Sequence, residues 1–146
     1  MHEWDTDEYR ADRDRLYDAI RAEFPELVTR RFECYSGWFP ILRQFFATAS
    51  DALKDHPERE FALLQIKEKF GALCIYYRLI PFQFGVEDVI GGRISAAYRV
   101  AEETAAMTCD VCGKPGVLRV RNGWYATRCE DHADRGVPFP PPEGAP

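Results

Sequence analysis

Hydrophobic residues in the N-terminal part of the chain recur at the three- and four-residue spacing of amphipathic helices. The first stripe predicts a helix over about residues 7–24, and it consists of Leu16, Tyr17, Ile20 and Phe24. Asp5, followed three residues later by Glu8, is the predicted N-cap of this helix. The second stripe predicts a helix that begins near Pro40, and it consists of Ile41, Leu42, Phe45, Phe46, Ala49 and Leu53.

The middle of the chain has the pattern of strands instead. Residues 61–68 and 72–79 resemble two strands, and residues 69–71 supply a short glycine turn between them, so a β-hairpin is predicted. A third helix is predicted over about residues 87–107. Each glycine of the pair at 91–92 disfavours a helix by about 1 kcal/mol relative to alanine. We therefore expect this helix to begin after the glycine pair.

Four residues of the types that bind zinc form two pairs in the C-terminal part, Cys109-x-x-Cys112 and Cys129-x-x-His132. Two ligands separated by two residues can reach one tetrahedral ion from a tight backbone knuckle. Four protein ligands close the tetrahedron and leave no position for an activated water molecule. The sequence therefore predicts one zinc ion with a structural role.

A hairpin is predicted between the two ligand pairs. Asn122-Gly123 lies between strand-like residues 117–121 and 124–128, and this dipeptide is a strong signal for a two-residue hairpin turn. The hairpin would carry Cys112 toward Cys129. A two-residue turn also fixes the register, in which Arg121 faces Trp124, Arg119 faces Ala126 and Val117 faces Arg128.

This register places three arginines and a tryptophan on one side of the predicted hairpin: Arg119, Arg121, Arg128 and Trp124. Three interpretations are open. Trp124 could anchor a protein partner, because tryptophan and arginine dominate binding hot spots. The same residues could stack bases and hold the phosphates of nucleic acid. Arg121 and Trp124 could instead form a self-contained cation–π pair.

The predicted elements amount to an α+β fold, with about three helices, a β-hairpin and a C-terminal zinc-ribbon hairpin. We expect residues 1–108 to form an acidic helix and an α+β core, and residues 109–135 to form a zinc ribbon packed on that core. Residues 136–146 are rich in proline and predict a mobile tail. The two remaining cysteines, Cys34 and Cys74, have apolar neighbours and are expected to be buried free thiols.

Charge is concentrated at the N-terminal end. Residues 1–26 contain nine acidic residues and four arginines, which accounts for the whole formal net charge of −5. That balance disfavours a protein dedicated to nucleic acid, although it leaves room for a local basic surface. The acidic helix is either a solvated face or a mimic of nucleic-acid phosphates. The charged N-terminus and the absence of a long apolar run predict a soluble, cytoplasmic protein.

No catalytic residues are predicted. His2 and His56 lie in no motif with a carboxylate or a nucleophile, and we expect His2 to belong to a mobile terminus. The sequence contains neither a phosphate-binding glycine loop nor a nucleophile elbow. We therefore expect a protein without enzymatic activity.

Three segments carry a resemblance to a known group of proteins. They are Gly37-Trp38-Phe39-Pro40, Lys67-Glu68-Lys69-Phe70-Gly71, and the ligand pairs from Cys109 to His132 with Gly123-Trp124 between them. Over about residues 34–135 the chain resembles a family of small, mostly uncharacterised bacterial and bacteriophage proteins. The resemblance implies a zinc-binding α+β domain in a phage or prophage context, and it implies no catalytic activity. We expect a module that acts by protein–protein contact, as an inhibitor or modulator of a host system, with nucleic-acid binding through the ribbon as the alternative.

Overall fold

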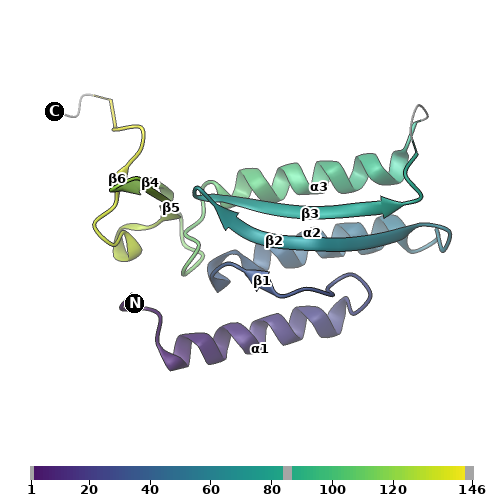
Figure 1. Ribbon diagram of the computed structural model, residues 1–146, viewed down its shortest axis with the longest axis horizontal. Coiled ribbons are helices and arrows are strands. Elements are labelled where there is room, and N and C mark those ends of the chain that lie inside the picture. Colours follow the sequence, from purple (N-terminus) through teal and green to yellow (C-terminus); the bar gives the residue numbers. More distant parts are fainter. Residues whose placement is uncertain (1, 84–86, 144–146) are drawn as a thin grey trace.

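The computed structural model describes residues 2–83 and 87–143, and the described part has the predicted α+β class. One sheet has the strand order β1-β2-β3, and a second, smaller sheet near the C-terminus has the order β5-β4-β6 (Figure 1). The elements are α1 (Asp7–Glu23), β1 (Phe32–Glu33), the 3-10 turn η1 (Ser36–Trp38), α2 (Phe39–Leu53), β2 (Glu60–Lys69), β3 (Ala72–Ile80), α3 (Val89–Ala105), β4 (Val117–Arg121), β5 (Trp124–Arg128), the 3-10 turn η2 (Glu130–His132) and β6 (Val137–Pro138).

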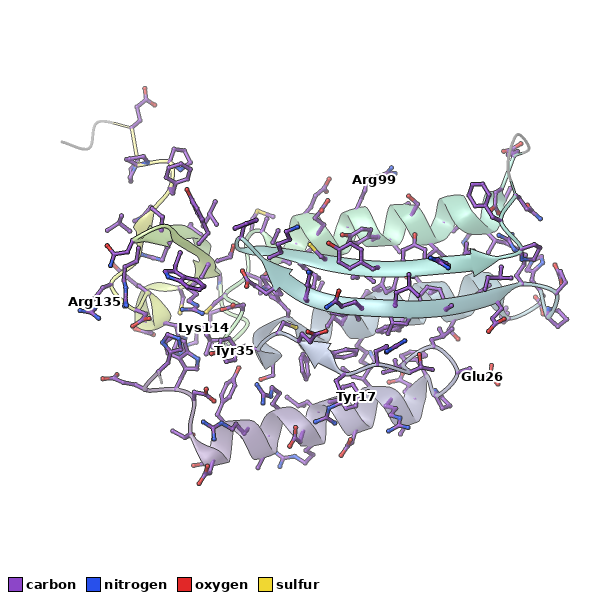
Figure 2. The ribbon with its side chains drawn as sticks, viewed as in Figure 1. Tyr17, Glu26, Tyr35, Arg99, Lys114 and Arg135 are labelled. Atoms are coloured by element: carbon purple, nitrogen blue, oxygen red, sulfur yellow. The ribbon has the colours of Figure 1, made fainter. Side chains whose placement is uncertain are left out.

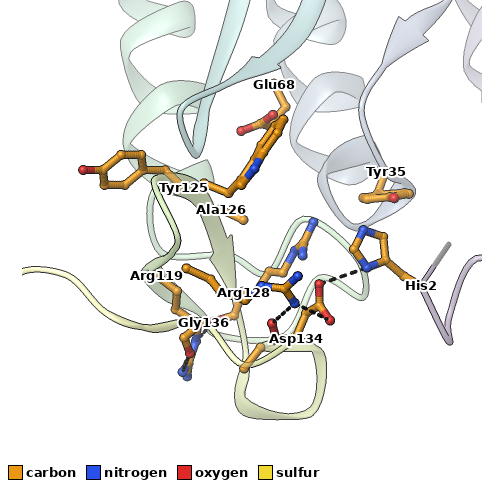
Figure 3. Close-up of a pocket in the computed structure, with 12 residues that line it drawn as sticks. His2, Tyr35, Glu68, Arg119, Tyr125, Ala126, Arg128, Asp134 and Gly136 are labelled. Carbon is orange, nitrogen blue, oxygen red and sulfur yellow. Dashed lines mark hydrogen bonds and ion pairs between the residues drawn. The ribbon is translucent and has the colours of Figure 1, made fainter.

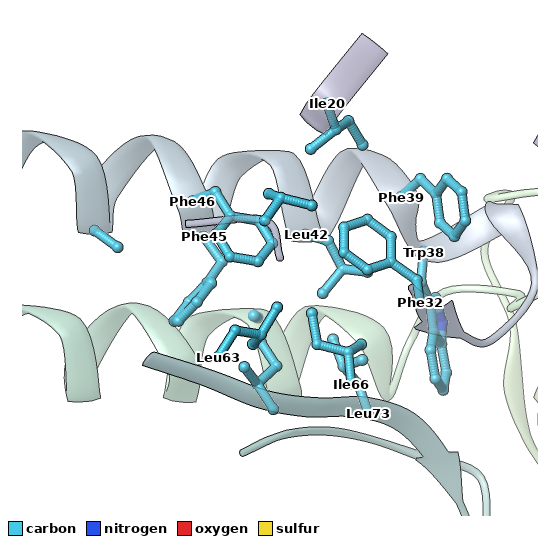
Figure 4. Close-up of a cluster of buried hydrophobic side chains, with 14 of the residues drawn as sticks. Ile20, Phe32, Trp38, Phe39, Leu42, Phe45, Phe46, Leu63, Ile66 and Leu73 are labelled. Atoms are coloured by element: carbon cyan, nitrogen blue, oxygen red, sulfur yellow. The ribbon is translucent and has the colours of Figure 1, made fainter. Parts of the chain in front are cut away.

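The predicted hairpin of β2 and β3 forms the centre of the molecule, and α2 and α3 lie together on one face of it (Figure 1). The turn between the strands is Phe70-Gly71, because Lys69, predicted to belong to the turn, is the last residue of β2. The short β1 pairs in parallel with β2. Apolar side chains from these elements fill one core (Figure 4), whose largest fully buried members include Trp38, Leu42, Phe45, Phe46, Ile66, Leu73 and Ile94.

Helix α1 matches the predicted range, but its cap differs. The N-cap is Thr6, whose hydroxyl accepts a hydrogen bond from the Tyr9 backbone N–H at 3.1 Å. Asp5 lies one residue too early for this role, and its carboxylate instead accepts from Arg10 Nε at 2.8 Å. Leu16, predicted to belong to the buried stripe, is 45% exposed.

Side chains of α1 attach it to β1 and α2 (Figure 2). Tyr17 packs edge to face on the core residue Phe32, and its hydroxyl donates to the Arg30 carbonyl at 2.9 Å. Acidic residues of the helix pair with arginines from neighbouring segments, and these ion pairs are Asp14–Arg31 and Glu23–Arg43. Part of the negative charge that stands out in the sequence is thus neutralised within the fold.

Helix α3 begins at Val89, within the predicted range of about 87–107 but before the glycine pair rather than after it. The Asp88 carboxylate caps it by accepting from the Gly91 N–H at 2.9 Å. A Cβ atom at position 91 would lie 2.5 Å from Asp88 Oδ2, so this cap favours glycine there. Asp88 also receives two hydrogen bonds of 3.0 Å each from the buried guanidinium of Arg59. The stability of the cap outweighs the low helix propensity of the glycine pair.

The small C-terminal sheet has the predicted register, with Arg121 opposite Trp124, Arg119 opposite Ala126 and Val117 opposite Arg128. Its third strand, β6, falls within the segment predicted to be a mobile tail and pairs with β4. Just beyond β6, the Phe139 N–H donates to the Leu118 carbonyl at 2.9 Å. The proline-rich segment therefore leaves the domain only after this third strand, and residues 144–146 lie outside the described residues.

Candidate metal centre

The four candidate ligands come from two turns that the small sheet brings together. Cys109 and Cys112 lie in the turn that follows α3, whereas Cys129 precedes η2 and His132 is its last residue, directly after β5. Gly113 closes the first turn, with a φ of 82° and a hydrogen bond of 2.9 Å from its N–H to the Cys109 carbonyl. The positive φ explains why glycine follows the second cysteine.

The ligand atoms have the separations expected of a tetrahedral metal site. All four lie within 4.8 Å of one another. The distance from Cys112 Sγ to Cys129 Sγ is 3.7 Å, and His132 Nδ1 lies 3.4 Å from Cys129 Sγ and 3.8 Å from Cys109 Sγ. Zinc bonds of about 2.3 Å to sulfur and about 2.0 Å to nitrogen would give tetrahedral edges of roughly 3.5–3.8 Å. The sulfur–sulfur distance also excludes a disulfide, which needs about 2.05 Å.

The surroundings shift the pKa values of three of the candidate ligands in different directions. Burial raises the pKa of Cys129, but hydrogen bonds from the backbone N–H groups of His132 and Asp131 and from the neighbouring cysteines outweigh it, so the net pKa is lowered. Burial lowers the pKa of His132, with a further contribution from Arg128, which favours the neutral imidazole that a metal binds. Burial raises the pKa of Cys112 to about 11. A bound dication would supply the charge that stabilises this thiolate.

The first ligand turn is fastened to the helical core by three hydrogen bonds. The Gly37 N–H donates to the Asp110 carbonyl at 2.8 Å, Trp38 Nε1 donates to the Thr108 carbonyl at 2.9 Å, and the Tyr9 hydroxyl donates to the Val111 carbonyl at 2.8 Å. A Cβ atom at position 37 would lie 2.6 Å from the Asp110 carbonyl carbon. Only glycine allows the two backbones to approach this closely.

The small sheet is fastened to the tip of the β2–β3 hairpin. The Thr127 hydroxyl, which is buried, donates to the Gly71 carbonyl at 2.7 Å. The Gly71 N–H in turn donates to the Glu68 carboxylate at 2.6 Å. Gly71 has a φ of 83°, and a Cβ there would collide with the Leu118 side chain. Gly37 and Gly71, from two separate parts of the core, thus each hold a backbone segment of the C-terminal part close.

The three predicted surface arginines already have partners within the fold. Arg119 donates to the carbonyls of Arg128 at 3.0 Å and Gly136 at 3.2 Å. Arg121 donates to the Asp134 carbonyl at 2.9 Å and approaches its carboxylate at 3.3 Å. The sequence predicted an open basic face. In the structure, the guanidinium groups of these arginines are instead hydrogen-bonded to other parts of the chain.

Arg128 is the most enclosed of the three. Its Nε donates at 3.1 Å to the carboxylate of Asp110, which is 2% exposed. Burial raises the pKa of Asp110 to about 6, against the opposing effect of Arg128. The Arg128 guanidinium also lies 4.8 Å from the ring centre of Trp4 and 5.8 Å from that of Tyr35. Among the described residues, the cation–π contacts on this face thus involve Arg128, whereas the sequence suggested Arg121 with Trp124.

Trp124 itself is 80% exposed. It borders a pocket of about 420 Å³ on the outer face of β4 and β5 (Figure 3). Ala126 also lines this pocket, as do Tyr35, His2 and Glu68 from other parts of the chain. The predicted partner surface is therefore a concave aromatic site in which the arginines are structural members.

Sequence reasoning missed the N-terminal segment. His2 was expected in a mobile terminus, but its ring stacks on that of Trp4, with ring centres 4.4 Å apart. Its Nδ1 also lies 3.0 Å from the Asp134 carboxylate (Figure 3). Trp4 packs edge-on against the candidate ligand His132, with ring centres 5.4 Å apart. A tryptophan within a charged segment was the available signal, since such a residue seldom remains in solvent without a packing role.

The other two cysteines lie apart from the metal cluster. Cys34 and Cys74 are both half-buried rather than fully buried, because each sits at an edge of the core. Burial raises the pKa of the Cys34 thiol strongly, and the nearby Asp110 acts in the same direction. A thiol in such surroundings is a poor nucleophile and a poor metal ligand.

Comparison with known protein families, curated proteins and solved structures found no match for this chain. None of the helices in residues 2–83 and 87–143 combines the length and the apolar character needed to cross a membrane. The site therefore has to be interpreted from its own geometry and chemistry.

Proposed function

We propose that this chain is a non-enzymatic binding module, stabilised by one structural zinc ion, that docks a protein partner on the Trp124 face. The docking of a protein partner is inferred from the contrast between Trp124 and the arginines on that face. Trp124 is 80% exposed, whereas the arginines beside it are engaged by carbonyl groups and carboxylates of the same chain.

The chemistry of the ligand set supports zinc as the ion. Three thiolates and one imidazole in a tetrahedral arrangement form the donor set of structural zinc sites. Cys109, Cys112, Cys129 and His132 would hold the ion, and they would leave no coordination position open for a substrate or a reactive water. Zinc bound in this way supplies folding free energy rather than chemistry.

The contacts of the arginines favour a protein partner over nucleic acid. Arg121 would have to leave Asp134, and Arg128 would have to leave the buried Asp110, before either could hold a phosphate. Removing a partner from a buried charge is costly. An exposed tryptophan beside a pocket needs no such rearrangement, because it can be buried directly as an anchor.

Zinc content and nucleic-acid binding test the two halves of the proposal separately. Protein purified without chelator is expected to contain one zinc ion per chain by elemental analysis. Duplex and single-stranded DNA are expected to bind negligibly at about 0.15 M salt, because Arg119, Arg121 and Arg128 already have partners within the chain. Micromolar or tighter DNA binding, abolished by replacing Arg119, Arg121 and Arg128 with alanine, would establish the nucleic-acid alternative.

The partner surface is tested with matched variants on the same strand pair. Proteins retained from a bacterial lysate by the wild-type chain are expected to be lost with Trp124→Ala and kept with Arg121→Ala. Phe70→Ala, which removes another exposed aromatic residue outside the pocket, serves as a control. Equal retention by wild type and Trp124→Ala would argue against the Trp124 face.

The biological setting we propose follows from the family resemblance. A small module of phage or prophage type that contacts a protein would act as an inhibitor or modulator of a host system, in the cytoplasm of a bacterial or phage-infected cell. The genes neighbouring its own would test this, because phage structural, regulatory and anti-defence genes cluster separately. A location among housekeeping genes would contradict it.

A further inference from the structure

The N-terminal segment lies against the candidate metal site, although the two are far apart in the sequence. His2 and Trp4 lie against the part of the chain from Arg128 to Asp134, which follows β5, and Figure 3 shows His2 beside Tyr35 and Asp134. Trp4 therefore packs on His132, one ligand of the second pair, and His2 is fixed to Asp134 two residues later.

Trp4 is held in place from several sides. It packs edge-on against Tyr35, with ring centres 6.0 Å apart, and the Arg128 guanidinium lies 4.8 Å from its ring centre. His2 stacks on Trp4 at an interplanar angle of 3° and is itself fixed by the Asp134 carboxylate. The indole is consequently a well-positioned group rather than a loosely attached one.

The Trp4 indole also contacts His132, one of the four candidate metal ligands. The ring centres of Trp4 and His132 lie 5.4 Å apart and the rings meet at 80°, so Trp4 covers one side of the imidazole whose Nδ1 approaches the Cys109 and Cys129 thiols. Groups around a metal ligand fix its orientation, and the apolar shell around a site controls the access of water to it.

We propose that Trp4 is a positioning residue of the metal centre, which holds the His132 ring in its ligating orientation and shields the metal site from water and competing ligands. The inference rests on the proposed zinc site. The N-terminal segment would thus have two roles: Trp4 would help to retain the metal, and His2 lines the pocket beside Trp124.

The rate of zinc release tests this assignment. Zinc-loaded full-length chain is mixed with an excess of a metallochromic chelator, and the release rate is followed by absorbance. Trp4→Ala is expected to release zinc on the order of ten-fold faster than wild type, in line with other changes around metal ligands. Trp124→Ala is the matched control, because it removes an indole that is 80% exposed from the same small sheet, and its rate is expected to equal that of wild type.

Two further measurements separate positioning from a general loss of structure. Trp4→Phe keeps an aromatic ring against His132 and is expected to restore slow release. The absorption spectrum of the cobalt-loaded protein is expected to show the same tetrahedral site in Trp4→Ala as in wild type, with only the rate of metal loss changed. If Trp4→Ala does not fold, His2→Ala provides the comparison, because it removes the stacked ring and is expected to give faster release.

The outcomes distinguish this inference from the proposal on which it rests. Equal release rates for Trp4→Ala and Trp124→Ala, from protein that binds one zinc per chain, would overturn the role of Trp4 and leave the zinc site intact. Wild-type protein that binds no zinc would overturn the proposed function itself, and the role of Trp4 with it.

Discussion

The helical core and the C-terminal ribbon (residues 109–135) are stabilised by different forces. The core buries large apolar side chains from every one of its helices and from the β2–β3 hairpin. In the ribbon, by contrast, the buried residues are Cys109, Asp110, Val111 and Thr127, and none of them is a large apolar side chain. Apolar burial on that scale cannot offset the conformational entropy of ordering the segment. Under the proposed zinc site, the ribbon would depend on the bound ion for its folding, whereas the core would not.

Removal of a metal ligand should produce the largest effect and should divide the molecule along this boundary. Cys129→Ser is expected to lose the ion and to unfold residues 109–135, because structural zinc supplies free energy of order 10 kcal/mol in small modules. Backbone NMR signals of the ribbon should collapse while those of α1, α2 and α3 remain. Cys74→Ser, which replaces a cysteine outside the cluster, should retain the ion and both sets of signals. Complete unfolding of the core in Cys129→Ser would contradict the division.

A cavity in the core should have the next largest effect. Phe46→Ala removes a fully buried ring, and it is expected to lower the free energy of unfolding by about 3–5 kcal/mol. Denaturant unfolding followed by far-UV circular dichroism would measure this change. Below the unfolding transition the variant should still contain one zinc ion per chain. Phe70→Ala, at a position that is 71% exposed, should change the free energy by less than about 0.5 kcal/mol.

A change at the junction should affect both regions together. Gly37→Ala places a methyl group against the backbone of Cys109 and Asp110, so one of the two segments has to move. We expect a loss of about 1–3 kcal/mol in the free energy of unfolding, together with weaker zinc retention. Gly92→Ala is the control, because a Cβ there meets nothing within 4 Å. Unchanged stability in Gly37→Ala would mean that the ribbon is attached less tightly than the hydrogen bonds indicate.

The smallest effect concerns the thiol of Cys34. Because burial raises its pKa, this thiol should remain protonated at pH 8–9, where an ordinary cysteine is about half ionised. Iodoacetamide should therefore label Cys34 slowly in the native, zinc-loaded protein and rapidly after denaturation. Peptide mass spectrometry would identify the labelled residues. Rapid native labelling of Cys34 would show that the edge of the core opens readily.

The three helices and the two hairpins could be predicted from local sequence patterns, whereas the short strands β1 and β6 could not. The ribbon register follows from the two-residue turn at Asn122-Gly123, and the positions of β2 and β3 follow from the turn at Phe70-Gly71. The ligand set was equally accessible, because two-residue spacings bring cysteine and histidine side chains to one point. Each of these features depends on residues close together in the chain.

The remaining features depend on contacts between distant residues, which no local pattern contains. The exposed basic face was expected because alternation places Arg119 and Arg121 outward. Alternation cannot show that a loop carrying Asp134 and Gly136 returns to accept their hydrogen bonds. The packing of Trp4 on His132 was missed for the same reason. The cap at Asp88 was missed because a glycine pair was weighed by helix propensity alone, without the hydrogen bond that its backbone makes.

The contact between His2 and Asp134 has a consequence for the order of events during synthesis. The ribosome releases the N-terminal residues first, and domains generally begin to fold while the chain is still growing. The part of this surface that carries Arg128, His132 and Asp134 exists only after the ribbon has emerged and folded. The first residues to be made are thus among the last to reach their native positions. Until then, an exposed indole and an acidic helix precede a core that can already be folding.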